Sequence, residues 1–184
     1  SRGLGDVYKR QSYDKLILSP GAKPTQPRLP GLGLDKLFTL RTVEDTFRIK
    51  DYININHPTS AVLAGGGFIG LELAENLREL GMEVTIVQRP KQLMNPFDSD
   101  MAAFIHNEMR KHGVKLALGH TVEGFAEVGG GVDMLLKDEQ PLHADMVILA
   151  IGVYPETTLA KDAGLELGIK GCLLYTSPSP RDTR

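Results

Sequence analysis

The sequence contains a single cysteine, Cys172, among its 184 residues. One cysteine excludes an internal disulfide and any metal cluster built from cysteine ligands. Positive charge is not in excess either: the net charge is −2 and no block of like charges occurs, so the chain has no basic footprint for nucleic acid. No apolar run approaches the length of a membrane span, and residues 1–11 lack the apolar centre of a secretory signal. We therefore expect a soluble, cytoplasmic protein that handles a small molecule and binds neither nucleic acid nor membrane.

The two ends of the chain are related to each other in an unusual way. When "SRGLGDVYKRQ" (residues 1–11) is written in permitted codons, the complementary strand, shifted by one base, encodes "CLLYTSPSPR" from residue 172 onward. Unrelated protein segments are not expected to be reverse complements, and the DNA resembles a sequencing-library adapter. We therefore expect residues 1–11 and 172–184 to be translated adapter that packs poorly, and they are left out of the predicted fold.

Strands and helices alternate in the middle of the chain. Short apolar segments predict buried strands, and apolar residues at helical spacing predict the helices between them. The strands are predicted at 60–65, 83–88 and 114–119, and the helices at 68–80 and 98–113, each helix ended by a glycine. A meander over 121–144 and a return strand over 144–152 follow. This order indicates an α/β, Rossmann-like domain with a parallel sheet and right-handed crossovers.

Three further segments precede this unit. An apolar strand is expected over 13–22 and an irregular, proline-rich crossing over 23–33. A helix is expected over 42–53, with Thr42 as N-cap and Asp45 as its capping-box partner. The apolar residues expected to face the core are Val43, Phe47, Ile49 and Ile53 in this helix, and Ile69, Leu73, Leu77 and Leu80 in the helix over 68–80.

The turn between the strand at 60–65 and the helix at 68–80 contains Gly65-x-Gly67-x-x-Gly70. In a dinucleotide-binding turn, the first glycine permits the tight turn, the second lets a pyrophosphate approach, and the third allows close helix–strand packing. The phosphates would lie at the helix N-terminus. A purely structural turn without a ligand is the alternative interpretation.

The end of the next strand bears on the choice of nucleotide. NAD-binding units usually carry an acid there, which hydrogen bonds to the adenosine ribose. This chain has Gln88, followed by Arg89 and Lys91. Glutamine can still bond a hydroxyl group and does not repel a 2′-phosphate, and the cations could pair with one. The cations could equally be solvated loop charges, so the choice between NAD and NADP stays open.

Five ordered stretches carry a resemblance to a known family: "SYDKLILSPGAKPTQPRLPG", "LRTVEDTFRIK", "AVLAGGGFIGLELAENL", "EVTIVQRPKQLMNPFDSDM" and "ADMVILAIGVYPETTLAKDAGLELG". They resemble the middle of FAD-dependent pyridine nucleotide–disulfide oxidoreductases, and most of all the coenzyme A disulfide reductases, NADH oxidases and persulfide reductases. The resemblance covers residues 12–171. It implies an FAD-binding remnant at 12–40, an NAD(P)-binding Rossmann-like domain at 41–150, and the start of a return to the FAD-binding domain at 151–171.

The resemblance also implies cofactor-binding residues. Gly65, Gly67, Phe68, Ile69 and Gly70 match the pyrophosphate loop, where Phe68 would cover the flavin until nicotinamide enters. Other matches are Glu72 near the carboxamide, Ile151 and Gly152 beside the nicotinamide, Pro155 at the return to the FAD domain, and Ser19 and Gly21 in a turn that contacts FAD. Pro20 in place of threonine and Gln88 in place of an acid depart from the family pattern.

The resemblance implies an intact parent enzyme that passes a hydride from NAD(P)H to FAD and then reduces a disulfide, a persulfide or oxygen, as a homodimer. The redox cysteine and most FAD-binding segments are not in this chain, so no catalytic residue or metal site is predicted and the chain itself is expected to be inactive. The alternatives are a redox-sensing NAD(H)-binding module and a single-domain dehydrogenase. The second needs an acid–base residue, but the histidines at 106, 112, 120 and 143 share no motif and are interpreted as surface residues.

Overall fold

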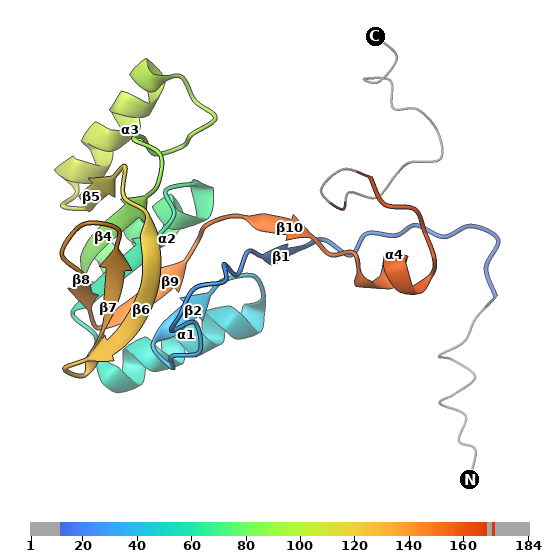
Figure 1. The fold of residues 1–184 in the computed structure, drawn as a ribbon, viewed down its shortest axis with the longest axis horizontal. Coiled ribbons are helices and arrows are strands. Elements are labelled where there is room, and N and C mark those ends of the chain that lie inside the picture. Colours follow the sequence, from blue (N-terminus) through green and yellow to red (C-terminus); the bar gives the residue numbers. More distant parts are fainter. Residues whose placement is uncertain (1–11, 169–170, 172–184) are drawn as a thin grey trace. The chain divides into compact units, whose positions relative to one another are not determined.

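The computed structural model describes residues 12–168 and 171 (Figure 1). The expectation of poorly packed adapter at 1–11 and 172–184 therefore lies outside the described residues. The chain divides into two compact units, of which the larger is Lys23–Tyr154, while the described residues on either side of it belong to the smaller. The assignment of parts of the chain to an FAD-binding domain stays a prediction.

A parallel sheet of five strands forms the centre of the larger unit, in the order β2-β9-β3-β4-β5 (Figure 1). The strands are β2 (Leu37–Thr39), β3 (Ser60–Ala64), β4 (Glu83–Gln88), β5 (Lys115–Leu118) and β9 (Met146–Leu149). The register is continuous, so that Val62 of β3 lies between Thr85 of β4 and Val147 of β9. The alternation of parallel strands with helices confirms the α/β, Rossmann-like fold expected from the sequence.

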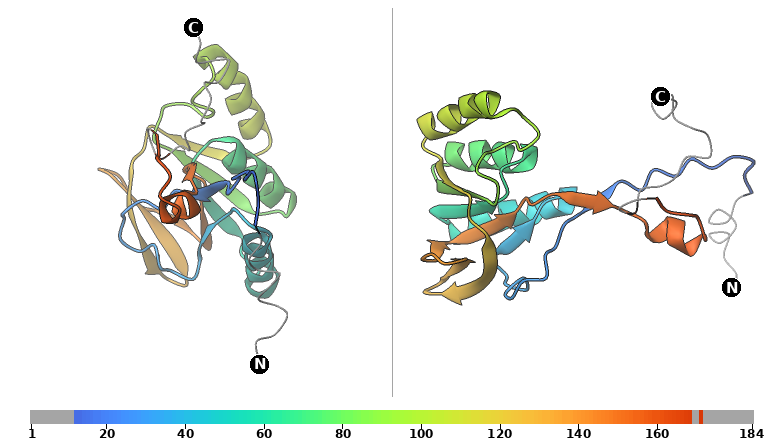
Figure 2. Two further views of the ribbon diagram at one scale, coloured as in Figure 1. Left: turned by 90° about the vertical axis from the view of Figure 1, so that its right-hand side faces the viewer. Right: turned by 45° about the horizontal axis from the view of Figure 1, so that its top comes forward.

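Two apolar cores lie on opposite faces of this sheet, because successive strand residues point to opposite sides. Ala61 and Leu63 enter a core shared with the helices, whereas Val62 and Ala64 enter a core shared with an antiparallel meander. The helices are α1 (Val43–Asn56), α2 (Phe68–Glu79) and α3 (Ser99–Lys111), and the meander strands are β6 (Val122–Val128), β7 (Gly131–Leu136) and β8 (Leu142–Ala144). The larger unit therefore has three layers (Figure 2).

The ends of the helices agree with the sequence signals. The Thr42 side chain accepts a hydrogen bond from the Asp45 backbone N–H, and the Asp45 carboxylate accepts one from the Thr42 N–H, at 3.2 and 3.0 Å. This pair is the capping box expected at the start of α1. Gly81 and Gly113, which follow α2 and α3, have φ of 84° and 77°. Their left-handed backbone confirms both glycines as helix stops.

The buried face of α2 agrees only in part with the predicted one. Ile69 and Leu80, both expected to face the core, are 41% and 64% exposed, whereas Gly70 and Ala74 are buried. The helix lies so close to the sheet that a Cβ on Gly70 would meet the Gly65 carbonyl oxygen at 2.0 Å. Leu77 is buried and Leu73 packs partly against the core as predicted. The small residues Gly70 and Ala74 complete the inward face, and an apolar pattern alone does not detect this kind of contact.

The predicted face of α1 is also partly wrong. Val43 and Phe47 are 66% and 58% exposed, while Ile49 is buried and Ile53 packs partly against the helix-side core. Tyr52, which was not in the predicted set, packs instead, with its ring centroid 5.1 Å from that of Phe38. The buried stripe of α1 is therefore narrower than predicted and is shifted toward Tyr52.

The strand expected over 13–22 does not form as predicted. Only β1 (Ala22–Pro24) is a strand, and it pairs with β10 (Val153–Pro155). Residues 13–21 belong to no ladder within the described chain, and Ile17 is 90% exposed. Apolar alternation makes a strand only where a partner satisfies the backbone groups. The smaller unit also contains a short helix, α4 (Thr158–Asp162).

Candidate functional site

The carboxyl ends of β3, β4, β5 and β9 border a pocket of about 590 Å³ at one edge of the sheet. Parallel order brings these strand ends together, and open α/β sheets bind their ligands at this edge. The glycine-rich turn after β3 and the segments after β4, β5 and β9 all contribute to the lining. The fold thus joins four stretches that are far apart in sequence.

Gly65 and Gly70 hold the glycine-rich turn against the sheet. Gly65 has a φ of 115°, and a Cβ there would lie 2.2 Å from the Ala150 carbonyl oxygen. A Cβ on Gly70 would lie 2.0 Å from the Gly65 carbonyl oxygen. No side chain fits at either distance without movement of the backbone. These contacts match the tight turn and the close helix–strand packing expected of the two positions.

Gly67 has a different environment. It is the N-cap of α2 and lines the pocket, and a Cβ there would meet no atom within 4 Å. Within the described chain, no side chain caps this helix. The first N–H groups of a helix have no partner inside the helix, and together with the helix dipole they favour an anion. A pyrophosphate therefore fits this end of the pocket.

The end of β4 carries an amide in place of an acid. The Gln88 side-chain oxygen accepts a hydrogen bond from the Gly66 N–H at 3.0 Å, which ties β4 to the glycine-rich turn. Arg89 is exposed and lines the pocket, whereas Lys91 is outside the lining. Among the described residues that line this pocket, none is acidic. The described pocket lining therefore has a guanidinium group next to Gln88 and no carboxylate that would oppose it.

The loop after β9 forms another wall. Ile151 and Gly152 both line the pocket, as the family resemblance implies for residues beside a nicotinamide. Gly152 has a φ of 112°, and its carbonyl accepts a hydrogen bond from the Thr25 N–H at 2.9 Å. Thr25 is itself a lining residue, so this bond holds two pocket segments together.

Several predicted residues do not line the pocket. Phe68, Ile69 and Glu72 lie on α2 outside the lining, and Phe68 is 70% exposed. Ser19 and Gly21 lie in the smaller unit, where the Gly21 carbonyl accepts a hydrogen bond from the Glu156 N–H at 2.9 Å. The roles that the resemblance gives these residues stay predictions.

The sequence patterns did not single out other lining residues. These are Thr25, Pro27, Leu29, Pro90, Asn95, Pro96, His120, Thr121, Val122 and Phe125. His120, interpreted as a surface residue, has a side chain only 26% exposed, and its Nδ1 lies 3.0 Å from a Glu139 carboxylate oxygen. The sequence therefore did not predict that His120 is half-buried and lines the pocket. The rule that ligands bind at the carboxyl ends of the strands would have found it, because it follows β5 directly.

A polar cluster at the opposite edge of the sheet joins β9, β3 and α1. One carboxylate oxygen of Asp145 accepts hydrogen bonds from both the backbone N–H and the hydroxyl groups of Thr59 and Ser60, at 2.7 to 3.1 Å. The Tyr52 hydroxyl donates to the Asp145 carbonyl at 3.1 Å. Burial alone would raise the pKa of Asp145, but the hydrogen bonds from Thr59 and Ser60 lower it below its usual value.

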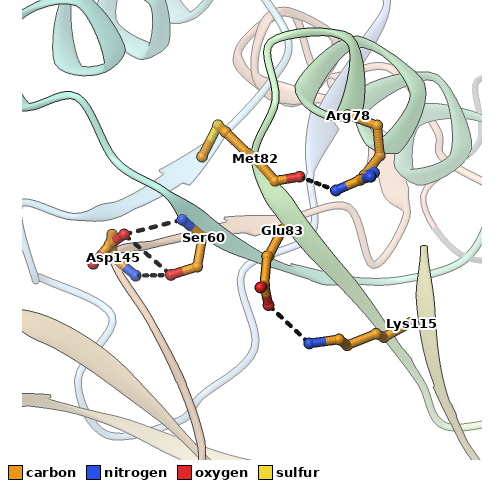
Figure 3. Close-up of polar contacts among 6 residues, drawn as sticks. All are labelled: Ser60, Arg78, Met82, Glu83, Lys115 and Asp145. Carbon is orange, nitrogen blue, oxygen red and sulfur yellow. Dashed lines mark hydrogen bonds and ion pairs between the residues drawn. The ribbon is translucent and has the colours of Figure 1, made fainter. Parts of the chain in front are cut away.

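Two further side chains, Arg78 and Lys115, fix the same edge (Figure 3). Arg78, in the last turn of α2, donates to the Met82 carbonyl at 2.6 Å and to the His112 carbonyl at 3.0 Å. Lys115 of β5 donates to the Glu83 carboxylate of β4 at 2.8 Å, and this bond lowers the pKa of Glu83. These contacts hold the amino ends of the strands and leave the carboxyl ends open for a ligand.

A parallel sheet with a glycine-rich turn and an uncapped helix N-terminus at its carboxyl edge is the arrangement of a Rossmann-type domain. The sequence profile of the family described as pyridine nucleotide-disulphide oxidoreductase matches residues 4–175. The chain belongs to this family. Within the described residues, no helix is both long and apolar enough to cross a membrane.

Two curated relatives show how the chain relates to whole enzymes. The NADH oxidase of Methanocaldococcus jannaschii is 38% identical over 159 residues, which cover 85% of this chain and 35% of the oxidase. A coenzyme A disulfide reductase of Staphylococcus aureus is 33% identical over 161 residues, which cover 88% of this chain and 35% of the reductase. The chain therefore spans about a third of the length of these relatives.

Solved structures share the fold. The reduced CoADR-RHD protein of Bacillus anthracis matches with a TM-score of 0.81 and 51% identity, over 88% of this chain and 29% of that chain. An engineered water-forming NADPH oxidase bound to NADPH, made by five substitutions in the Lactobacillus brevis NADH oxidase, matches with a TM-score of 0.77 and 31% identity, over 88% of this chain and 35% of that chain.

Proposed function

We propose that this chain is the NAD(P)H-binding part of an FAD-dependent oxidoreductase. The observation that carries the proposal is Gly67, an open glycine in the pocket at the start of a helix that no side chain caps in the described chain. The N–H groups of Gly67, Phe68 and Ile69 would hold the pyrophosphate, and Ile151 and Gly152 would lie beside the nicotinamide. Glu72 would lie near its carboxamide.

In the parent enzyme, NAD(P)H supplies a hydride, which carries two electrons, and FAD accepts it. The electrons then reduce a disulfide, a persulfide or oxygen. The names NADH oxidase and coenzyme A disulfide reductase among the relatives support oxygen and a disulfide as acceptors, and the persulfide rests on the family resemblance. We propose that the parent is a cytoplasmic homodimer and that Phe68 covers its flavin until nicotinamide enters. This chain holds no residue predicted to be catalytic, so we expect no reductase activity from it.

We further propose that the pocket accepts both NADH and NADPH. In the engineered NADPH oxidase, an aspartate became alanine and the alanine after it became arginine. The engineered protein also carries a substituted glycine before this aspartate. The spacing from that glycine to the aspartate equals the spacing from Gly70 to Gln88 in this chain, so Gln88 and Arg89 correspond to the altered pair. By the same count, this chain has Gly70, Pro90 and Asn95 at the positions where the engineered protein has alanine, serine and arginine. This chain therefore shares two of the five substituted features, the missing acid and the arginine after it, which supports use of both nucleotides rather than of NADPH alone.

Calorimetric titration of the 184-residue chain with NADH and with NADPH tests both proposals. We expect both to bind with Kd values within about tenfold of each other, because an exposed arginine–phosphate contact contributes about 1 kcal/mol. The purified chain should hold no stoichiometric flavin and reduce no disulfide. Failure of both nucleotides to bind at millimolar concentration would refute the binding function.

Three variants separate cofactor choice from binding itself. Gln88→Glu keeps an acceptor for the Gly66 N–H but adds a charge, so it should weaken NADPH more than NADH. Arg89→Ala should weaken NADPH alone. Lys91→Ala is the matched control, because it removes the same charge outside the pocket lining and should leave both affinities nearly unchanged. A wild-type preference for NADH of about a hundredfold, or an unchanged NADPH affinity in Arg89→Ala, would overturn the relaxed choice alone.

A further inference from the structure

The loop from residue 89 to residue 97, between β4 and α3, forms one wall of the pocket. Arg89, Pro90, Asn95 and Pro96 all line the pocket. The loop contains no regular helix or strand, so its conformation depends on individual anchors. The contacts that fix this loop therefore determine where Arg89 and Asn95 lie.

The loop is fixed to the glycine-rich turn by two neighbouring residues. The Leu93 side chain is fully buried, and its Cδ2 would lie 2.3 Å from a Cβ placed on Gly66. The Met94 N–H donates to the Gly66 carbonyl at 2.8 Å. Met94 has a φ of 47°, in the left-handed region that a side chain disfavours. Such a backbone persists only where its surroundings hold it in place.

His106 of α3 supplies the third anchor. Its Nε2 accepts a hydrogen bond from the Leu93 N–H at 2.9 Å, so the ring is neutral in this contact. Burial lowers the pKa of His106, and the nearby Arg110 lowers it further. Both effects favour the neutral ring. His106 itself is outside the pocket lining.

We propose that His106 is a positioning residue for nucleotide binding, which holds the loop 89–97 against Gly66 through its hydrogen bond to the Leu93 N–H. This rests on the proposed nucleotide-binding function. Without the acceptor, a part-buried N–H loses its partner and the left-handed turn at Met94 loses a neighbouring constraint. The loop then samples other conformations, and only a fraction of molecules presents Arg89 and Asn95 to a ligand.

The test compares an acceptor-free variant with an acceptor-bearing one in the 184-residue chain. His106→Leu removes the acceptor, whereas His106→Gln places an amide oxygen at a similar reach. We expect His106→Leu to weaken NADH binding by about five- to tenfold, and His106→Gln to stay within about threefold of the wild type. His112→Leu, the same substitution in an exposed residue at the end of α3, is the control and should bind NADH as the wild type does.

Amide hydrogen exchange without nucleotide gives an independent readout of the loop. We expect faster exchange at Leu93 and Met94 in His106→Leu than in His106→Gln. If His106→Leu does not fold, His106→Asn, whose shorter side chain does not reach the Leu93 N–H, takes its place. Wild-type NADH affinity in the acceptor-free variant, or equal weakening by the Leu and Gln variants, would overturn the proposal. A wild-type chain that binds no nucleotide would instead refute the binding function itself.

Discussion

At the scale of single residues, the three motif glycines divide into two kinds. Gly65 and Gly70 are held against backbone oxygens at 2.2 and 2.0 Å, whereas Gly67 faces open space in the pocket. The sequence motif predicted these different roles because each has its own geometric requirement. The motif could not predict that Gln88 bonds to the Gly66 N–H or that His120 lines the pocket, since both contacts depend on how distant strands align.

Alanine at Gly70 should therefore lower mainly the stability of the fold, and alanine at Gly67 mainly the affinity for NADH. Gly70→Ala places a Cβ against the Gly65 carbonyl, so it should lower the free energy of unfolding by roughly 1–3 kcal/mol. Gly67→Ala meets no atom of the protein and should change the free energy of unfolding by less than about 0.5 kcal/mol. Its methyl group occupies the space proposed for the pyrophosphate, so NADH affinity should fall by about fivefold or more. Urea unfolding and NADH titration of both variants measure the two effects.

A Gly67→Ala variant that binds NADH like the wild type would contradict the pyrophosphate position. A Gly70→Ala variant with unchanged stability would show that the turn relaxes around the added methyl group.

At the scale of elements, the helix ends and most strands of the parallel sheet followed from local signals, whereas the buried faces of the helices followed only in part. The capping box of Thr42 and Asp45 and the stop at Gly81 depend only on neighbouring residues. Val43 and Phe47 are exposed although they are apolar residues at helical spacing, because burial depends on a partner surface that local spacing does not encode. The strand β2 was missed because its three residues are too few to give a pattern.

The Asp145 cluster should make the stability of these elements depend on pH. The folded pKa of Asp145 is lowered, so its carboxylate stabilises the fold above the unfolded pKa, and this stabilisation disappears as the pH falls through the folded pKa. Asp145→Asn should therefore cost about 1 kcal/mol at pH 7, and the difference from the wild type should shrink below about pH 4. Thermal unfolding of both proteins across pH measures this difference. Asp51→Asn, on an exposed face of α1, is the control.

A constant difference between the wild type and Asp145→Asn from pH 7 down to pH 3 would show that the charge of Asp145 does not contribute. Equal losses in Asp51→Asn and Asp145→Asn would assign the effect to net charge instead.

At the scale of the whole molecule, the family resemblance predicted more than the local patterns could. It placed an NAD(P)-binding unit between FAD-binding segments, and the match over residues 4–175 confirms the family. The boundary of the larger unit at Lys23 shows that the proline-rich segment and β2 pack with the parallel sheet. Composition alone could not predict this, because that segment has no repeating apolar pattern. The chain corresponds to about a third of the relatives' length, so electron transfer belongs to the proposed parent enzyme.

The central claim is that NAD(P)H binds at the carboxyl edge of the parallel sheet. Amide hydrogen exchange of the 184-residue chain, measured with and without saturating NADH, tests it most directly. We predict slower exchange in the four segments at the carboxyl ends of the strands, residues 65–70, 88–96, 119–122 and 149–152, and little change at the opposite edge around Thr59 and Asp145. Protection centred on the opposite edge, or no protection in the glycine-rich turn at saturating NADH, would contradict the account.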